Sequence, residues 1–200
     1  MYGKVGVQSL SSGSTGPIRL DTRGNVHGAK GGKYTEATLA GRMFAAANQA
    51  VVTSTAGLAA TYTGLALCNP TGSGKNIIVH EVGLVNEIAV PTAAAIFGVM
   101  TGGGVGAATA VIAGRNRLSG GVASVAYVDN AVIFTEAPVL EQVFCTFHTG
   151  AVTTGIGSGC YAVLDGSLVI TPGYHASIYI SAVNAVTWMG SFLWEEVDTE

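Results

Sequence analysis

The stretch NPTGSGKN, residues 69–76, carries the proline, glycines and lysine expected of a phosphate-binding loop. Such a loop needs a glycine, four spacers and then Gly-Lys-Ser/Thr, because backbone N–H groups wrap the phosphates and the hydroxyl reaches Mg²⁺. Gly74 and Lys75 are in place, but Asn69 stands where the first glycine belongs. Asn76 replaces the hydroxyl residue, and strand-like segments lie on both sides. We therefore expect a hairpin turn here rather than a nucleotide site.

A second glycine-rich pattern lies in residues 97–111. Gly102, Gly104 and Ala107 satisfy the loose G-x-G-x-x-A form of a dinucleotide-binding turn. That turn requires repeated strand-helix-strand units and an acidic residue about 20 positions further on. Asp129 is at a possible distance, but no convincing helical pattern separates it from the glycines. We expect a flexible loop or a crossover between sheets, and no cofactor.

Histidines and cysteines are the remaining reactive side chains. The histidines are His27, His80, His148 and His175, and the cysteines are Cys68, Cys145 and Cys160. No G-x-S-x-G or H-E-x-x-H motif is present, and on a strand the adjacent His80 and Glu81 point to opposite faces. The cysteines are odd in number and lack the CxxC pair of a zinc site, so we interpret them as small buried residues in a reducing compartment. The residue types predict no enzyme and no metal site.

The composition limits the architecture that could position any site. A chain of 200 residues and 20.1 kDa is long enough for one hydrophobic core. Only 10% of its residues are charged, against about 25% in an average soluble domain, and its mean hydropathy is +0.46. Neighbouring subunits or a membrane would have to cover such a surface. Polar residues, proline and glycine interrupt the uncharged stretches 43–74 and 88–114, so we expect no membrane span, and the first residues show no secretory signal.

The few charges are unevenly distributed. Residues 1–42 contain six basic and two acidic side chains, a net of +4, and residues 43–200 contain three basic and ten acidic ones, a net of −7. The basic segment could bind an acidic neighbouring subunit or nucleic acid, or it could be a solvated tail. It has no block of consecutive lysines or arginines and no interleaved aromatics, so we favour subunit clasping and expect no nucleic acid. Residues 1–33 are predicted to be an extended arm and residues 34–200 a β-sandwich domain.

Short segments with a period near two fill the rest of the chain. The clearest is HASIYISAV, residues 175–183, in which small or apolar residues alternate with Ser and Tyr. Glycine, proline and Asp-Gly turns separate the segments, and together they predict an all-β, antiparallel β-sandwich or jelly roll. The other predicted strands are 58–68, 76–85, 93–100, 122–128, 143–148, 160–164, 167–171 and 187–197. Residues 36–51 also show helical spacing weakened by Gly41, so that segment and residues 137–144 stay ambiguous.

The carboxyl end combines both tryptophans with acidic residues. Alternation over residues 187–197 places Phe192, Trp194 and Glu196 on one face and Glu195 on the other. We expect Trp188 and Trp194 to anchor the sandwich core or a seam between subunits. The acidic end, which includes Glu195 and Glu196, could meet the basic arm of a neighbour or be solvated.

Three segments resemble small Gly/Ala/Thr-rich virion structural proteins of tailed bacteriophages. They are GKYTEATLAGRMFAA (32–46), LALCNPTGSGKNIIVHEVGL (65–84) and GSFLWEEV (190–197). The resemblance follows the general pattern and order of residues over roughly 32–197. It implies a non-enzymatic particle component, a β-sandwich or jelly roll, and a homo-oligomer, with trimers common among such proteins.

These observations lead to one expected function and one alternative. We expect a capsid decoration or cement protein of the virion that binds its own copies and the major capsid protein or other virion proteins. The alternative is a tail or surface adhesin that binds a host receptor or glycan through loops 101–106, 115–121 and 148–159. The residues predicted to contact subunits or the shell are Arg19, Arg23, Lys30, Lys33, Arg42, Trp188, Trp194, Glu195 and Glu196.

Overall fold

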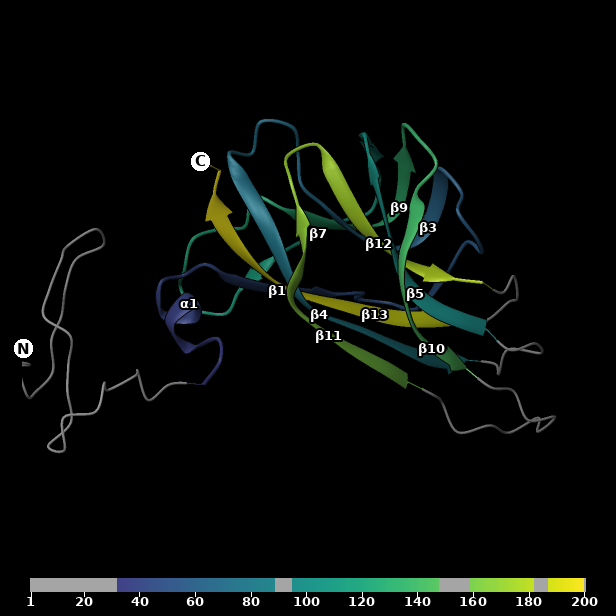
Figure 1. Cartoon of the computed structure of the whole chain (residues 1–200), viewed down its shortest axis with the longest axis horizontal. Coiled ribbons are helices and arrows are strands. Elements are labelled where there is room, and N and C mark those ends of the chain that lie inside the picture. The colour runs from purple at the N-terminus through teal and green to yellow at the C-terminus, as the bar shows by residue number, and fades with distance from the viewer. Residues whose placement is uncertain (1–31, 89–94, 148–158, 182–186, 200) are drawn as a thin grey trace, which may run out of the picture. The chain divides into compact units, whose positions relative to one another are not determined.

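The structure is a computed structural model that describes residues 32–88, 95–147, 159–181 and 187–199 (Figure 1). The chain divides into two units, Met1–Glu36 and Ala37–Glu200. The second unit contains all the strands described below. The predicted arm, residues 1–33, lies outside the described residues except for its last two positions, so its extended form stays a prediction.

The described part of the chain is dominated by β-strands, because alternating inward and outward side chains recur along most of its segments. A single short helix, α1 (Thr35–Leu39), precedes the strands among the described residues. The strands are β1 (Met43–Ala47), β2 (Val52–Thr53), β3 (Thr61–Cys68), β4 (Lys75–Ile88), β5 (Ala95–Gly103), β6 (Val105–Ala108), β7 (Val111–Ala113), β8 (Arg115–Asn116), β9 (Tyr127–Phe134), β10 (Val139–Phe147), β11 (Gly159–Ile170), β12 (Tyr174–Ile180) and β13 (Thr187–Asp198).

The strands form two antiparallel sheets. The six-stranded sheet has the order β11-β4-β13-β1-β8, with β2 also paired to β13. The seven-stranded sheet has the order β10-β5-β12-β3-β9-β6, with β7 also paired to β9. Eight of these strands form the framework of the sandwich, and in chain order they are β1, β3, β4, β5, β10, β11, β12 and β13. When these eight are numbered 1 to 8, one sheet has the order 1-8-3-6 and the other has the order 2-7-4-5. This is the strand order of a jelly roll, so the predicted fold class is confirmed.

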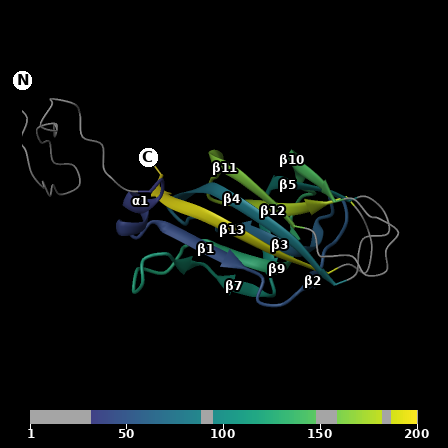
Figure 2. The same ribbon diagram turned by 90° about the horizontal axis from the view of Figure 1, so that it is seen from below.

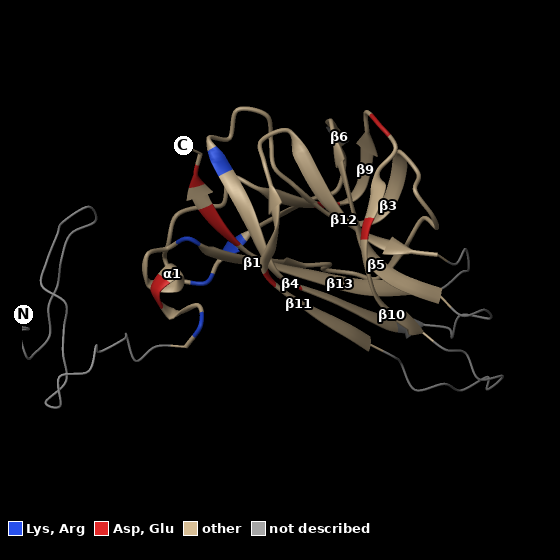
Figure 3. Ribbon diagram, in the orientation of Figure 1, with Lys and Arg blue, Asp and Glu red and all other residues tan. Residues whose placement is uncertain are grey.

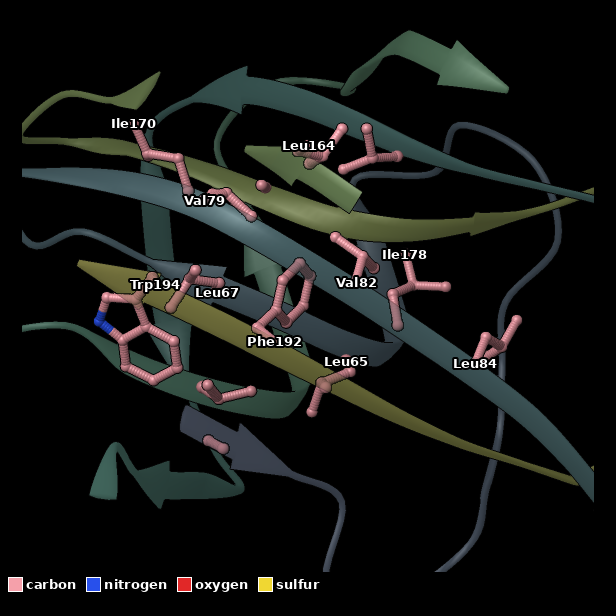
Figure 4. Packing of buried hydrophobic residues seen from close by; sticks show 14 of the residues in the cluster. Leu65, Leu67, Val79, Val82, Leu84, Leu164, Ile170, Ile178, Phe192 and Trp194 are labelled. Carbon is pink, nitrogen blue, oxygen red and sulfur yellow. The ribbon is translucent and has the colours of Figure 1, made fainter. Parts of the chain in front are cut away.

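Side chains from the two sheets interleave to form the main hydrophobic core (Figure 4). Phe192 of the six-stranded sheet packs in the same cluster as Leu65 and Ile178 of the other sheet. The alternation noted in the sequence explains this, because every second residue of each strand points toward the opposite sheet. The other face of the six-stranded sheet is seen in Figure 2, where β11, β4, β13 and β1 lie side by side.

Both tryptophans belong to the main core. Trp194 is fully buried, and its ring stacks on Phe44 with centroids 6.1 Å apart. Trp188 is 4% exposed and its ring centroid lies 5.0 Å from that of Phe147. Of the two roles predicted from the sequence, the structure therefore places the tryptophans in the sandwich core.

The seven-stranded sheet closes on itself at one end. β6 follows β5 after Gly104 alone, and β6 pairs with β9, which pairs with β3. The path β5-β12-β3-β9-β6 thus returns to the strand from which it started. Gly104 permits this bend because its φ of 74° is left-handed and a Cβ there would overlap Thr135. The enclosed second cluster contains Tyr62, Ala66, Cys68, Met100, Val132 and Phe134.

Several local predictions are decided by the structure. Residues 36–51 form α1 and then β1, because Gly41 has a φ of 72° between them and ends the helix. Residues 137–144 belong largely to β10. The predicted strand 122–128 is mostly wrong, since β9 begins only at Tyr127. The two strands predicted over 160–171 are one strand, β11, whose pairing with β4 is irregular around Asp165 and Gly166.

The cysteines differ from their interpretation in the sequence. Cys145 of β10 and Cys160 of β11 form a disulfide with Cα atoms 6.7 Å apart, and Cys68 is a buried free thiol. β10 is an edge strand of one sheet and β11 an edge strand of the other, so the disulfide links the two sheets. Interpreting Cys145 and Cys160 as unpaired small residues was therefore wrong, whereas Cys68 is a buried unpaired cysteine as expected.

Candidate functional site

The polar groups of the loop between β3 and β4 make hydrogen bonds within the loop and to β11. The Asn69 amide donates hydrogen bonds to the carbonyl oxygens of Lys75 and Ile170, at 2.8 and 2.9 Å. The Ser73 hydroxyl donates to Asn69 Oδ1 at 2.6 Å. The expected hairpin is wrong, because β3 and β4 lie in different sheets and the loop carries the chain between them. The asparagine that replaced the glycine of a phosphate-binding loop thus holds a tight turn between sheets.

The glycine-rich segment 97–111 is mainly strand rather than the expected loop. It forms β5 and β6, and the distant Asp129 returns to it from β9. The fully buried Asp129 carboxylate accepts hydrogen bonds from the N–H groups of Thr109 and Ala131 at 2.9 and 2.6 Å. The Ala110 N–H also donates to it, at 3.3 Å. The acidic residue that fitted a dinucleotide site by spacing therefore stabilises the turn between β6 and β7.

Inside the closed end of the seven-stranded sheet, strand pairing brings together residue types used in nucleophilic catalysis. Cys68 of β3 lies opposite His175 of β12 in the register, and Asp129 lies on β9, the next strand. All three side chains are fully buried. Burial, and secondarily Asp129, raises the pKa of the Cys68 thiol to about 12. Because the nucleophile is the thiolate, the burial and raised pKa of Cys68 disfavour a nucleophilic role at neutral pH.

His175 should make the protein sensitive to moderate acid. Its ring stacks on Phe134 with centroids 3.6 Å apart, and its Nδ1 lies 2.9 Å from Ser177 Oγ. Burial lowers the pKa of His175 to about 4, from an ordinary value of 6.5. The unfolded chain therefore takes up a proton below pH 6.5 that the folded chain accepts only near pH 4, and stability falls across that window. Urea unfolding at a series of pH values should show this slope, and His175→Gln should flatten it; an unchanged slope would contradict the assignment.

The structure shows where the predicted contact residues lie. Arg19, Arg23 and Lys30 fall outside the described residues, and Lys33 lies in the first unit. Trp188 and Trp194 are in the core, as described above. Arg42 Nε lies 2.8 Å from Glu195 Oε1, and His80 Nε2 lies 3.7 Å from Glu195 Oε2. Arg42 and Glu195 thus meet each other on the outer side of the six-stranded sheet.

Glu196 is 5% exposed and points into the chain. Its carboxylate accepts hydrogen bonds from the Ser124 hydroxyl, from the N–H groups of Val125 and Ala126, and from Trp194 Nε1. These donors come from a segment about 70 residues away and from the neighbouring core tryptophan. Glu196 therefore fastens residues 124–126 to β13, and its side chain is not on the surface of the described chain.

The outer face of the six-stranded sheet is one of the uncovered surfaces that the alternation creates. Strand register places Ala45, Leu193 and Glu81 in one row across β1, β13 and β4. Arg115 of β8 and Val163 of β11 extend this row at its two ends. A second row contains Ala47, Ser191, Gly83 and Tyr161. We call these two rows the outer-face rows.

Small residues make this face hollow. Two adjoining depressions of about 370 and 440 Å³ share Ala47, Ser191 and Tyr161 in their linings. Tyr161 is 60% exposed, and an edge of its ring would lie 3.8 Å from a Cβ on Gly83. A second hydrophobic side chain of β11, Val163, is 55% exposed. The face combines a floor of small side chains with exposed apolar ones, as surfaces that bind other molecules do.

Charged side chains border the same hollow. Arg115, Arg117 and Glu81 all line the smaller depression, of about 370 Å³. No ion pair or hydrogen bond joins these three side chains to another described residue. These three charged residues were not predicted from the sequence, because the charge pattern was interpreted only in the two terminal segments. The sequence pattern that could have indicated the hollow lies at the outward positions of the predicted strands 76–85 and 187–197. These positions hold Gly83, Ser191 and Leu193 beside Glu81.

The fold and this face define the class of the protein as a jelly-roll sandwich with an uncovered sheet surface. Comparison with protein-family models, with curated proteins and with solved structures found no match for this chain. Within the described ranges, no cluster of three or more His, Cys, Asp or Glu side chains could hold a metal ion. No helix in the described part of the chain is long and apolar enough to cross a membrane.

Proposed function

We propose that this protein is a structural component of a tailed-bacteriophage virion, a decoration or cement protein that binds the capsid shell and its own copies. The observation that carries the proposal is the outer face of the six-stranded sheet, which leaves large apolar side chains such as Val85, Tyr161 and Val163 uncovered in a chain with only 10% charged residues. Figure 3 shows that most of the described ribbon is free of charged residues. A particle component can leave such a face open because neighbouring molecules cover it.

The resemblance to virion proteins in the segments 32–46, 65–84 and 190–197 supports the same proposal. It implies a homo-oligomer, with trimers common among such proteins, and a non-enzymatic role. The jelly roll is used by viral capsid proteins as well as by lectins, so the fold agrees with the proposal at the level of analogy. The Cys145–Cys160 disulfide fits a particle released from the host cytoplasm in which it was assembled, because such bonds persist in oxidising surroundings.

Co-sedimentation with capsid shells tests the function. Shells assembled without this protein should bind the purified full chain at many copies per particle. Shells that carry it should resist heat or low salt better than bare shells. A saturated binding curve with no gain in resistance would point to decoration without cementing, and no binding at any concentration would contradict the proposal.

Removing residues 1–33 should lower shell binding without affecting the folding of the β-sandwich. The described strands all lie beyond this segment, so the truncated chain should keep the far-ultraviolet circular dichroism of a β-sandwich. If the basic arm clasps an acidic neighbour, shell binding should fall at least tenfold and become less sensitive to salt, because fewer screened charge contacts remain. The matched control replaces Arg19, Arg23, Lys30 and Lys33 by glutamine in the full-length chain. Unchanged shell binding by both proteins would refute the clasp.

A tail or surface adhesin is the second candidate. The specific observation in its favour is the hollow with an exposed Tyr161 ring beside Arg115, Arg117 and Glu81, since glycans commonly need an aromatic face and charged hydrogen-bonding partners. Of the loops expected to bind, residues 101–106 are mostly strand, residues 115–121 begin with β8, and residues 148–158 lie outside the described residues. An adhesin would be present in few copies per virion and would bind host cells or polysaccharide when isolated.

A further inference from the structure

We propose that the hollow on the outer face of the six-stranded sheet binds an extended, acidic segment of a shell protein. This inference deepens the proposed function and rests on it for the identity of the partner. It names the chemistry of the segment, which carries a carboxylate side chain and a bulky apolar side chain about four residues apart.

Two arginines at one end of the hollow form its anion-binding half. Arg115 pairs with Ala45 of β1, and the Arg117 N–H donates to the Met43 carbonyl at 2.8 Å, so the pairing with β1 continues to residue 117. Positions 115 and 117 lie on the same side of the chain, about 7 Å apart. Both side chains are exposed, line the hollow and make no ion pair or hydrogen bond with another described residue. A carboxylate at this end can accept hydrogen bonds from both guanidinium groups.

The adjoining depression, of about 440 Å³, supplies the apolar half. Gly83 and Ser191 lie side by side on its floor, and their small size leaves room for a bulky apolar side chain. Val85 is 51% exposed and Tyr161 60% exposed at its border. Only Ser191 and Tyr161 among the lining residues have a side-chain oxygen or nitrogen. A saccharide would find few hydrogen-bonding partners here, so the lining favours a protein segment.

The distance between the two halves sets the spacing in the partner. Arg115 of β8 and Gly83 of β4 are separated by three strand spacings, or about 14 Å. An extended chain advances about 3.3 Å per residue, and its side chains alternate between two sides. Two side chains about four residues apart therefore point the same way and reach both halves. Glu81 lies at the β4 end and would repel a carboxylate there, so the segment binds in one direction.

Charge argues against this chain's own arm as the occupant. Residues 1–33 carry five basic side chains and one acidic side chain. Arg115 and Arg117 would therefore repel the arm of a neighbouring copy. A segment of opposite charge avoids this repulsion, so we place the shell contact on this face and the contact between copies on another surface.

Charge removal in the full-length chain tests the anion-binding half by co-sedimentation with capsid shells assembled without this protein. Arg115→Gln/Arg117→Gln should raise the dissociation constant about tenfold and flatten its dependence on salt, because two charge contacts are lost. Each single arginine variant should raise it about threefold. The matched control is Lys75→Gln, which removes one positive charge that pairs with the exposed Asp198 and does not line the hollow. It should change the dissociation constant by less than about twofold.

Two further variants test the apolar half. Ala47 lines both depressions, so Ala47→Trp should fill the hollow and raise the dissociation constant for shells about tenfold. Tyr161→Ala should raise it about fivefold, because it removes a ring that the partner's apolar side chain contacts. Since Tyr161 is 60% exposed, this truncation separates binding from folding. Circular dichroism should show that every variant keeps the β-sandwich.

Photo-cross-linking identifies the bound segment. The replacement of Tyr161 by p-benzoylphenylalanine keeps an aromatic ring at an exposed position. Mass spectrometry of irradiated complexes should find it joined to a shell protein, in a segment with Asp or Glu about four residues from a bulky apolar residue. A segment without such a pair, or a cross-link to a second copy of this chain, would overturn the inference.

The outcomes separate this inference from the proposed function. If the wild type binds no shells, the proposed function fails and the inference fails with it. If the wild type and Arg115→Gln/Arg117→Gln bind shells equally, the proposed function stands and the shell contact lies on another surface. If the same variant keeps shell binding but loses binding to host polysaccharide, the hollow is a glycan site and the inference is overturned.

Discussion

Replacing Glu196 by alanine should lower the free energy of unfolding by at least about 3 kcal/mol. The buried carboxylate accepts hydrogen bonds from the Ser124 hydroxyl, two backbone N–H groups and the Trp194 indole. Alanine would leave these buried donors without an acceptor, and each unsatisfied group costs about 1–3 kcal/mol. Urea unfolding followed by tryptophan fluorescence would measure the loss, because both tryptophans are buried in the folded chain.

The adjacent glutamate provides the matched control. Glu195 points to the outer side of the same strand, where its partner Arg42 has a side chain that is 43% exposed. Glu195→Ala should cost less than Glu196→Ala, because the ion pair that it removes is partly exposed on the Arg42 side, although Glu195 itself is 15% exposed and also lies 3.7 Å from His80. Glu196→Gln keeps an acceptor oxygen but loses the charge, so its cost should fall between those of the two alanine variants. Equal losses at 195 and 196 would contradict the anchoring role of Glu196, and unchanged stability with lost shell binding would restore the contact role predicted from the sequence.

Removing the disulfide should lower the free energy of unfolding by about 3 kcal/mol, the value expected for a closed loop of 15 residues. The bond joins an edge strand of one sheet to an edge strand of the other. Its loss increases the conformational freedom of the unfolded chain and loosens that edge of the folded sandwich. The double variant Cys145→Ser/Cys160→Ser should therefore melt at a lower temperature than the wild type. Adding dithiothreitol to the wild type should reproduce the same shift.

Two control experiments test whether the disulfide is the cause of this shift. The double variant should itself be insensitive to dithiothreitol, because its only cysteine is Cys68, a buried free thiol. In unfolded wild-type protein without reductant, an alkylating agent should label one cysteine, and mass spectrometry should find the other two in one linked peptide pair. Three labelled cysteines would show that the bond does not form.

The class of fold could be predicted from the sequence because it depends on local pattern. Alternation in 187–197 places every second residue inside, and glycine and proline turns limit strand length. The half-buried strand predicted at 175–183 is buried on both faces from His175 to Ile178. The closed end of the seven-stranded sheet could not be predicted. It depends on one left-handed residue, Gly104, and on β9 pairing with both β3 and β6, contacts that are distant in sequence. Helical spacing left residues 36–51 ambiguous: the first part is α1, and β1 is a strand because tertiary pairing with β13 outweighs local propensity.

By itself the sequence determined which side chains share a face, because a strand repeats every two residues. It therefore grouped Trp194 with Glu196 and separated both from Glu195. Only the tertiary structure decided what each face meets. The donors to Glu196, the partner of Cys145 and the row that holds Arg115 and Glu81 all come from strands or loops far along the chain. Local pattern carries no information about such pairings, since they follow from sheet order and register, which the packing of the whole sandwich sets.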